Sequence, residues 1–427
     1  MKTFETHESN VRGYIRDFPV VFKTAKDAHM VDEDDNVYID FFAGAGVMNY
    51  GHNNAKLKRA VMNYLEGDGI VHALDMGTEA KRNFIETFNE VIMQPRGMDY
   101  KLQFPGPTGT NAVESALKLA RKVTGRTQVV SFTNGFHGMT LGSLALTGNA
   151  SKRAGAGVPL THVTQMPFDG YLGVNADTLA YFEAFLNDAG SGVDKPAAVI
   201  VETVQGEGGL NVASWKWLRN LEKLCRRHDI LLIIDDIQMG CGRTGTFFSF
   251  EIAGIKPDMV CLSKAIGGMG LPMALVLIRP DLDQWNPGEH NGTFRGNNLA
   301  FVAAAEALDY WRNEALEEEI IMKGLRVRER LDDLAERFPR AKLAARGRGL
   351  IQGLASGVDG FAEDICREAF ANGLVMETAG VKSQVAKVMP PLTIDEEVLE
   401  QGLDIVEAAV VAVAARHFPA HYAKSVA

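Results

Sequence analysis

The chain has 427 residues, of which 46% are hydrophobic, and its formal net charge is −10 at pH 7. This length and apolar content allow a large core and more than one domain, whereas the negative charge argues against binding to nucleic acid or to an anionic membrane surface. The first residues are polar and lack the apolar stretch of a secretory signal, and no segment is apolar over a membrane-spanning length.

The cysteines lie far apart, without the paired spacing that is typical of a disulfide framework or a zinc site. They are Cys225, Cys241, Cys261 and Cys366. Three of them fall in or beside apolar runs. We therefore expect buried thiols, a reducing compartment, a cytoplasmic location and no metal site.

The order of strand-like and helical patterns predicts an α/β fold. Residues 31–40 contain two short strand-like pieces around an acidic turn, at 32–35, that we expect to be solvated. From residue 54 to about residue 311, apolar runs alternate with helical patterns, which predicts a large domain with a mostly parallel sheet. We expect an N-terminal segment (1–53), this large domain (54–320) and a C-terminal α+β domain (321–427). The first and last should form a smaller lobe.

A helix is predicted to begin at Gly109 and Thr110. The apolar residues that follow recur at helical spacing, at positions 112, 113, 116, 117 and 120. The N–H groups and the positive dipole end of a helix N-terminus suit a phosphate dianion, and glycine lets the backbone approach closely. A threonine before a helix can also be no more than a cap.

Four apolar runs are each followed by polar or aromatic residues. Residues 128–132 lead to Phe136 and His137, 197–201 to Glu202 and Glu207, 230–234 to Asp235 and Gln238, and 259–263 to Lys264. In an open α/β sheet, the carboxyl ends of parallel strands border the ligand-binding crevice. Lys264 could bind an aldehyde and Asp235 could keep a ring nitrogen protonated, the two functions that pyridoxal phosphate requires. Phe136 could stack on a flat cofactor ring.

Each of these residues also has an ordinary structural explanation. A lysine after a strand can extend into solvent, an aspartate there can cap the next helix, and an aromatic residue can belong to the core. The occurrence of all of them at strand ends in one chain favours a cofactor site.

These motifs resemble those of the class III aminotransferases, which are pyridoxal-phosphate enzymes of fold type I, over nearly the whole chain. The matching segments are the Thr-Gly-Thr at 108–110 and residues 136–138, 202–209, 235–245 and 263–264. Thr203 and Asp236 depart from the proline and glutamate of the family pattern. The expected fold is therefore that of fold type I, with a large mostly parallel sheet and a smaller α+β lobe.

The resemblance also implies roles for individual residues. Lys264 would form the Schiff base and move the proton, and Asp235 would hold the pyridinium. The other cofactor contacts implied are Gly109 and Thr110 at the phosphate, Phe136 and His137 at the ring, and Gln238 near the ring hydroxyl. Thr293 lies in a segment similar to one whose threonine reaches the phosphate of the neighbouring subunit, which implies a homodimer or a dimer of dimers.

Departures from the family pattern concern the substrate carboxylates. Met139 stands where relatives that act on ornithine, acetylornithine or 4-aminobutyrate carry an arginine. Lys387 replaces the arginine that binds the α-carboxylate of glutamate, and Glu207 holds the position of that arginine's glutamate partner. Because a lysine cannot bind a carboxylate bidentately, these changes should alter specificity. Arg295, where most relatives have glycine, offers a replacement cation.

Within the family, this combination is similar to members that exchange an amino group between glutamate and aspartate β-semialdehyde in ectoine biosynthesis. The expected partners are thus small amino acids and oxo acids. Another ω-aminotransferase and an aminomutase or racemase of the same fold remain open. A non-catalytic cofactor-binding protein is disfavoured, because a scaffold has no use for a Schiff-base lysine paired with a pyridinium acid.

Overall fold

The computed structural model describes residues 1–419. Its α-helices are α1 (Lys2–His7), α2 (Tyr14–Asp17), α3 (Ala43–Gly46), α4 (Ala55–Glu66), α5 (Glu79–Phe88), α6 (Gly109–Thr124), α7 (Leu141–Leu146), α8 (Ala150–Ala154), α9 (Thr178–Asn187), α10 (Trp215–Arg227), α11 (Asn298–Leu308), α12 (Ala315–Arg337), α13 (Phe361–Ala371) and α14 (Glu396–His417). Within this described part, no helix has both the length and the apolar character needed to span a bilayer.

The largest sheet has seven strands in the order β4-β12-β11-β10-β7-β5-β6. They are β4 (Lys101–Gln103), β5 (Val129–Phe132), β6 (Val163–Met166), β7 (Ala198–Val201), β10 (Leu231–Asp235), β11 (Met259–Leu262) and β12 (Leu275–Ile278). The strands from β11 to β6 are parallel, whereas β12 runs antiparallel to both of its neighbours. The predicted α/β fold with a large, mostly parallel sheet is confirmed.

Both faces of this sheet are buried. Successive side chains of a strand point to opposite faces, and in β10 Ile233 belongs to the same hydrophobic cluster as the apolar face of α6. Leu232 and Ile234 instead belong to the cluster that contains the apolar face of α10. Burial on two sides explains why the strands appear in the sequence as uninterrupted apolar runs.

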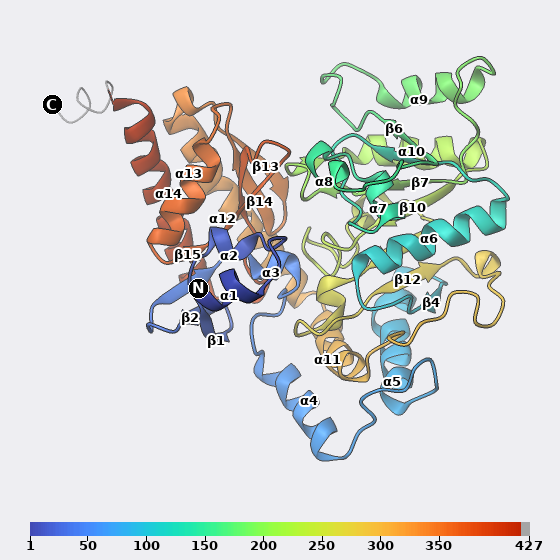
Figure 1. The fold of residues 1–427 in the computed structure, drawn as a ribbon, viewed down its shortest axis with the longest axis horizontal. Coiled ribbons are helices and arrows are strands. Elements are labelled where there is room, and N and C mark those ends of the chain that lie inside the picture. Colours follow the sequence, from blue (N-terminus) through green and yellow to red (C-terminus); the bar gives the residue numbers. More distant parts are fainter. Residues whose placement is uncertain (420–427) are drawn as a thin grey trace.

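The two ends of the chain share a smaller sheet, in the order β1-β2-β3-β15. Its strands are β1 (Phe22–Lys26), β2 (His29–Asp32), β3 (Val37–Asp40) and β15 (Leu374–Val375). The N-terminal strand β3 pairs in parallel with the C-terminal strand β15, so that Leu374 lies opposite Ile39. In Figure 1 the blue N-terminal elements accordingly lie beside the orange and red C-terminal ones. The predicted smaller lobe is therefore confirmed.

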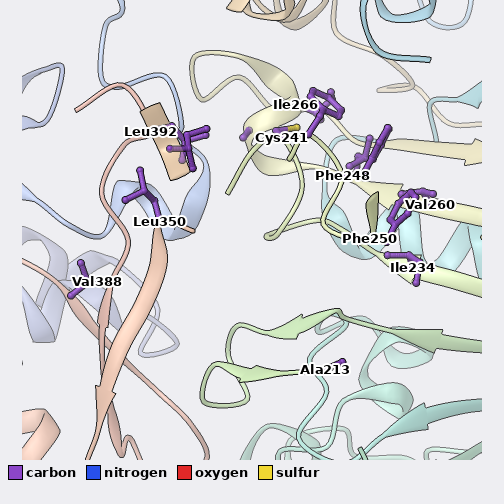
Figure 2. Packing of buried hydrophobic residues seen from close by; sticks show 14 of the residues in the cluster. Ala213, Ile234, Cys241, Phe248, Phe250, Val260, Ile266, Leu350, Val388 and Leu392 are labelled. Carbon is purple, nitrogen blue, oxygen red and sulfur yellow. The ribbon is translucent and has the colours of Figure 1, made fainter. Parts of the chain in front are cut away.

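A further antiparallel sheet has the order β13-β14-β17-β16, and β8 pairs with β9. The strands are β8 (Val204–Gln205), β9 (Asn211–Val212), β13 (Ala344–Arg348), β14 (Ile351–Ala355), β16 (Glu377–Ala379) and β17 (Val385–Val388). One hydrophobic cluster extends from the large sheet, at Ile234 and Val260, to the C-terminal part, at Leu350, Val388 and Leu392 (Figure 2). This shared core packs the smaller lobe against the strand ends that border the site.

The acidic turn of the N-terminal hairpin differs from expectation. Strands β2 and β3 pair in an antiparallel manner on either side of it. Asp32, however, is only 2% exposed and accepts hydrogen bonds from the backbone N–H groups of Asp34 and Asn36 and from the Tyr38 hydroxyl. The expectation of a solvated turn was wrong for this residue, because its carboxylate satisfies the donors of the turn itself.

Candidate active site

The ends of the parallel strands border a cavity of about 180 Å³. It is lined by Gly109, Thr110, Phe136, His137, Gly138, Glu202, Glu207, Asp235, Ile237, Gln238, Met239 and Lys264. Most of the site residues expected from the sequence therefore meet here. They meet because the parallel strands β5, β7, β10 and β11 all end at the same edge of the sheet.

Lys264 follows β11 in a short 3₁₀ helix, Lys264–Gly267. Its backbone has φ +53°, a left-handed conformation that is unusual for a residue with a side chain and is typical of functional sites. The amine donates a hydrogen bond to the carbonyl oxygen of Ala45 at 2.8 Å. Burial lowers the pKa of Lys264, although the charge of Glu207 opposes this. The lowered pKa favours the neutral amine, which is the nucleophilic form.

The Ala45 carbonyl is available because helix α3 is interrupted at that point. Gly44 and Ala45 both have left-handed backbone angles inside the helix. The same carbonyl also accepts from the side-chain amide of Gln238 at 3.0 Å. A segment of the N-terminal lobe thus contacts two residues that follow strands of the large sheet.

Asp235, the last residue of β10, forms a buried pair with His137. Its Oδ2 lies 2.7 Å from Nδ1 of His137, and its Oδ1 accepts from the N–H of Ile237 at 3.2 Å. Burial tends to lower the pKa of His137, but the hydrogen bond and charge of Asp235 outweigh it, so that the pKa is raised. This pairing fixes the Asp235 carboxylate at the strand end, within the cavity.

Glu202 is a second acid in this buried group. Burial raises its pKa to about 7, with His137 lowering it and Asp235 raising it. Its oxygens accept from the N–H groups of Phe136, at 2.8 Å, and Gly206, at 3.2 Å. Glu202 thereby fixes the backbone that carries Phe136 into the cavity.

The N-terminus of α6 forms another wall. The first N–H groups of a helix have no acceptor within the helix, and here they belong to Gly109 and Thr110. A Cβ atom added to Gly138 would lie 2.5 Å from Oγ1 of Thr110, and one added to Gly109 would lie 3.0 Å from the side chain of Ile237. Only glycine leaves this space open, beside a helix end that suits an anion.

These observations match a phosphorylated pyridine aldehyde. The helix end suits the phosphate, the Asp235 carboxylate suits a protonated ring nitrogen, and the Lys264 amine suits the aldehyde. Phe136 offers a flat ring in the same cavity. The residues present therefore fit such a cofactor.

Glu207 also lines the cavity and forms an ion pair with Lys387. Its Oε1 is 3.2 Å from Nζ of Lys387 and 3.4 Å from Nε2 of Gln238. Burial would raise the pKa of Glu207, but the charges of Lys387 and Lys264 outweigh it and lower the pKa to about 2. The carboxylate is therefore ionised at neutral pH.

The other expected substrate and phosphate residues lie elsewhere. Lys387, Met139, Thr293 and Arg295 do not belong to the lining of this cavity within the described chain. Met139 is 53% exposed. Arg295 donates to the carbonyl of Phe104 at 2.9 Å, and the Thr293 carbonyl contacts His72.

Sequence reasoning missed several groups at the site. Glu202 lies at a predicted strand end but received no role, although its position after an apolar run was the signal. The Ala45 carbonyl and Glu377, a neighbour of Lys387 at 2.5 Å, belong to no recognisable motif. Lys152, whose Nζ lies 4.4 Å from the centroid of the Phe136 ring, was also missed.

Comparison with known proteins identifies similar chains. The family model described as aminotransferase class-III matches residues 13–410. A diaminobutyrate–2-oxoglutarate transaminase of Oceanobacillus iheyensis is 58% identical over 410 residues, which cover 96% of both chains. A protein of the same name from Sporosarcina pasteurii is 59% identical over 411 residues, again covering 96% of both.

Solved structures with a similar fold were also found. The ornithine aminotransferase of Toxoplasma gondii, whose active site holds pyridoxal phosphate at partial occupancy, superposes with a TM-score of 0.84 at 26% identity, covering 96% of this chain and 93% of the other. A transaminase from the marine bacterium Virgibacillus has a TM-score of 0.87 at 19% identity, covering 97% and 99%. The latter likeness concerns the fold alone.

Proposed function

The chain belongs to the class III aminotransferases, as its motifs predicted, and on this premise we propose that it transfers an ω-amino group between L-2,4-diaminobutyrate and 2-oxoglutarate. The products would be L-aspartate 4-semialdehyde and L-glutamate, and in ectoine biosynthesis the reaction would run in the opposite direction. The protein is an aminotransferase whose cofactor is pyridoxal 5′-phosphate. The observation that carries the choice of substrates is the identity of 58–59%, over 96% of both chains, to relatives of that name.

The cofactor supplies a carbonyl that accepts the amino group and a protonated ring that withdraws electrons from the carbon that loses its proton. Lys264 would hold the cofactor covalently and carry the proton with its freed amine. Asp235 would keep the ring nitrogen protonated, and His137 would hold Asp235 in place by the bond described above. Phe136 would cover one face of the ring, and Gln238 would bind the ring hydroxyl.

For the phosphate, we assign the N–H groups of Gly109 and Thr110. Thr293 would reach the phosphate of a partner subunit, so that the active enzyme would be a homodimer or a dimer of dimers. Arg295 would then serve a carboxylate across the same interface. The division into residues 1–53, 54–320 and 321–427 and a cytoplasmic location are part of the same proposal.

For substrate selection, we assign Glu207, Lys387, Arg295 and Met139. The dual-substrate site must accept two different distal groups: a carboxylate when glutamate reacts, and an α-ammonium with its carboxylate when diaminobutyrate reacts. Met139 is exposed and apolar. It stands where relatives carry an arginine that binds a substrate carboxylate, so that cation is missing here. Glu207 provides an ionised carboxylate within the cavity, which suits an ammonium group.

A panel of amino donors tests this proposal. The holoenzyme is supplied with 2-oxoglutarate and, in turn, diaminobutyrate, ornithine, acetylornithine and 4-aminobutyrate, and glutamate formation is measured. We expect the highest kcat/KM with diaminobutyrate. Preference for another amine would reject the substrate assignment. A separate incubation with glutamate alone should release about one equivalent of 2-oxoglutarate per cofactor, whereas an aminomutase or racemase would release none.

A further inference from the structure

The ammonium group of Lys387 lies between two carboxylates. Its Nζ is 2.5 Å from Oε1 of Glu377 and 3.2 Å from Oε1 of Glu207. Glu377 and Lys387 face each other directly across the antiparallel strands β16 and β17, where such opposite charges stabilise the pairing. Burial raises the pKa of Glu377, whereas the charge of Lys387 lowers it.

The three side chains differ in how deeply they are buried. The side chain of Lys387 is 0% exposed, that of Glu377 is 10% exposed and that of Glu207 is 23% exposed. Glu207 lines the cavity that holds Lys264 and also a neighbouring cavity of about 520 Å³, which Glu377 and Tyr14 line as well. Lys387 is among the lining residues of neither cavity. A substrate that enters therefore meets the carboxylates and not the ammonium.

A buried ammonium cannot lose its only partner without a large cost, because an unpaired charge would remain in the protein interior. With Glu377 in place, Lys387 keeps a partner when Glu207 turns towards a substrate. Without Glu377, Glu207 would have to remain with Lys387. Glu377 therefore determines whether the Glu207 carboxylate is available to a substrate.

We propose that Glu377 is a positioning residue that holds the Lys387 ammonium and so frees the Glu207 carboxylate to bind the α-ammonium group of an ω-amino acid substrate. This inference rests on the proposed function, because it assigns the recognition of the amine substrate in that reaction. It also makes the two substrates unequal. The ionised Glu207 carboxylate attracts the α-ammonium of diaminobutyrate and repels the distal carboxylate of glutamate or 2-oxoglutarate.

Glu377→Gln in the holoenzyme tests the inference, because it should change KM for diaminobutyrate and KM for 2-oxoglutarate in different directions. We expect KM for diaminobutyrate to rise roughly tenfold or more, as for loss of a charge-assisted hydrogen bond. KM for 2-oxoglutarate should fall. Glu377→Asp, which keeps the charge, should recover most of the wild-type KM. Glu363→Gln changes an exposed carboxylate of the same 520 Å³ cavity and serves as the matched control.

The double variant E377Q/K387M removes the ammonium together with its second partner. Glu207 is then free again, and we expect KM for diaminobutyrate to return towards the wild-type value. This variant also carries the test if E377Q alone does not fold. A parallel rise of both KM values in E377Q, or failure of the double variant to recover, would overturn the proposal.

A binding measurement separates this proposal from the proposed function. Calorimetry of the holoenzyme with glutarate, an unreactive dicarboxylate, requires no turnover. We expect E377Q to bind glutarate roughly twofold to fivefold more tightly than the wild type. Weaker or unchanged binding would count against the charge argument, whereas absence of wild-type turnover with diaminobutyrate would reject only the proposed reaction.

Discussion

The amine of Lys264 donates a hydrogen bond of 2.8 Å to the carbonyl oxygen of Ala45, a residue 219 positions earlier in the chain. Ala45 belongs to α3 in the N-terminal lobe, whereas Lys264 follows β11 of the large sheet. The same carbonyl binds Gln238. The N-terminal lobe thus orients two of the proposed cofactor residues, and truncation of that lobe would disturb the site directly.

Lys264→Ala should abolish turnover while leaving the fold intact. The variant lacks the amine that would hold the cofactor and move the proton, a contribution of roughly 10²–10⁴-fold or more in kcat. Activity and the visible absorbance of protein-bound cofactor after gel filtration provide the measurements. Lys223→Ala, on the exposed side of α10, is the control. Normal transamination by the Lys264 variant would reject the assignment.

Asp235→Asn should retain cofactor but lose most of its activity, because a neutral amide no longer stabilises a protonated ring nitrogen. The pKa of His137 should fall in this variant, since Asp235 raises it against the effect of burial. NMR titration of the histidine ring nitrogens reports that pKa independently of catalysis. An unchanged kcat, or an unchanged His137 pKa, would contradict the respective role.

Gly138→Ala should weaken cofactor binding roughly tenfold or more. The added methyl would lie 2.5 Å from Oγ1 of Thr110, beside the N-terminus of α6. Gly125→Ala, at the other end of α6, is a matched control because Gly125 also has a positive φ, +67°, but open space around it. Gly125→Ala should lose about 1–2 kcal/mol of stability through its left-handed backbone, and Gly138→Ala should lose more because its φ is +126° and its methyl would contact Thr110. Equal cofactor dissociation constants for the two variants would contradict the proposed phosphate site.

Asp236→Asn should change how stability depends on pH. Burial raises the pKa of Asp236 from its ordinary value of 3.8 to about 7. Between these values the folded state binds the proton more tightly than the unfolded state, so this group's contribution to stability is complete below pH 3.8 and is lost as the pH rises to about 7. The asparagine variant lacks this loss, which is on the order of a few kcal/mol in the free energy of unfolding.

Thermal unfolding between pH 5 and 7.5 measures this effect. The melting temperature of D236N should rise relative to that of the wild type as the pH increases. Asp332→Asn, at an exposed position of α12, is the control and should follow the wild type. Parallel curves for D236N and the wild type would show that Asp236 is ionised in the folded protein throughout this range.

The sequence by itself predicted the sheet and most of the residues that line the cavity. Buried parallel strands require uninterrupted apolar runs, and their carboxyl ends must meet at one edge. Polar residues placed directly after such runs, as Asp235 and Lys264 are, therefore had to converge. The glycine and threonine at the start of α6 could be recognised for a similar reason, because helix ends have local signals.

Only the tertiary structure determined the groups that come from other parts of the chain. Neither the Ala45 carbonyl at Lys264 nor the Glu377 carboxylate at Lys387 has a local signal, because the first depends on how the lobes pack and the second on the register of β16 against β17. Asp32 likewise became buried through the turn that it organises. Local sequence patterns encode periodicity and strand ends, whereas the partner of a buried charge is decided by which distant segments the fold brings into contact.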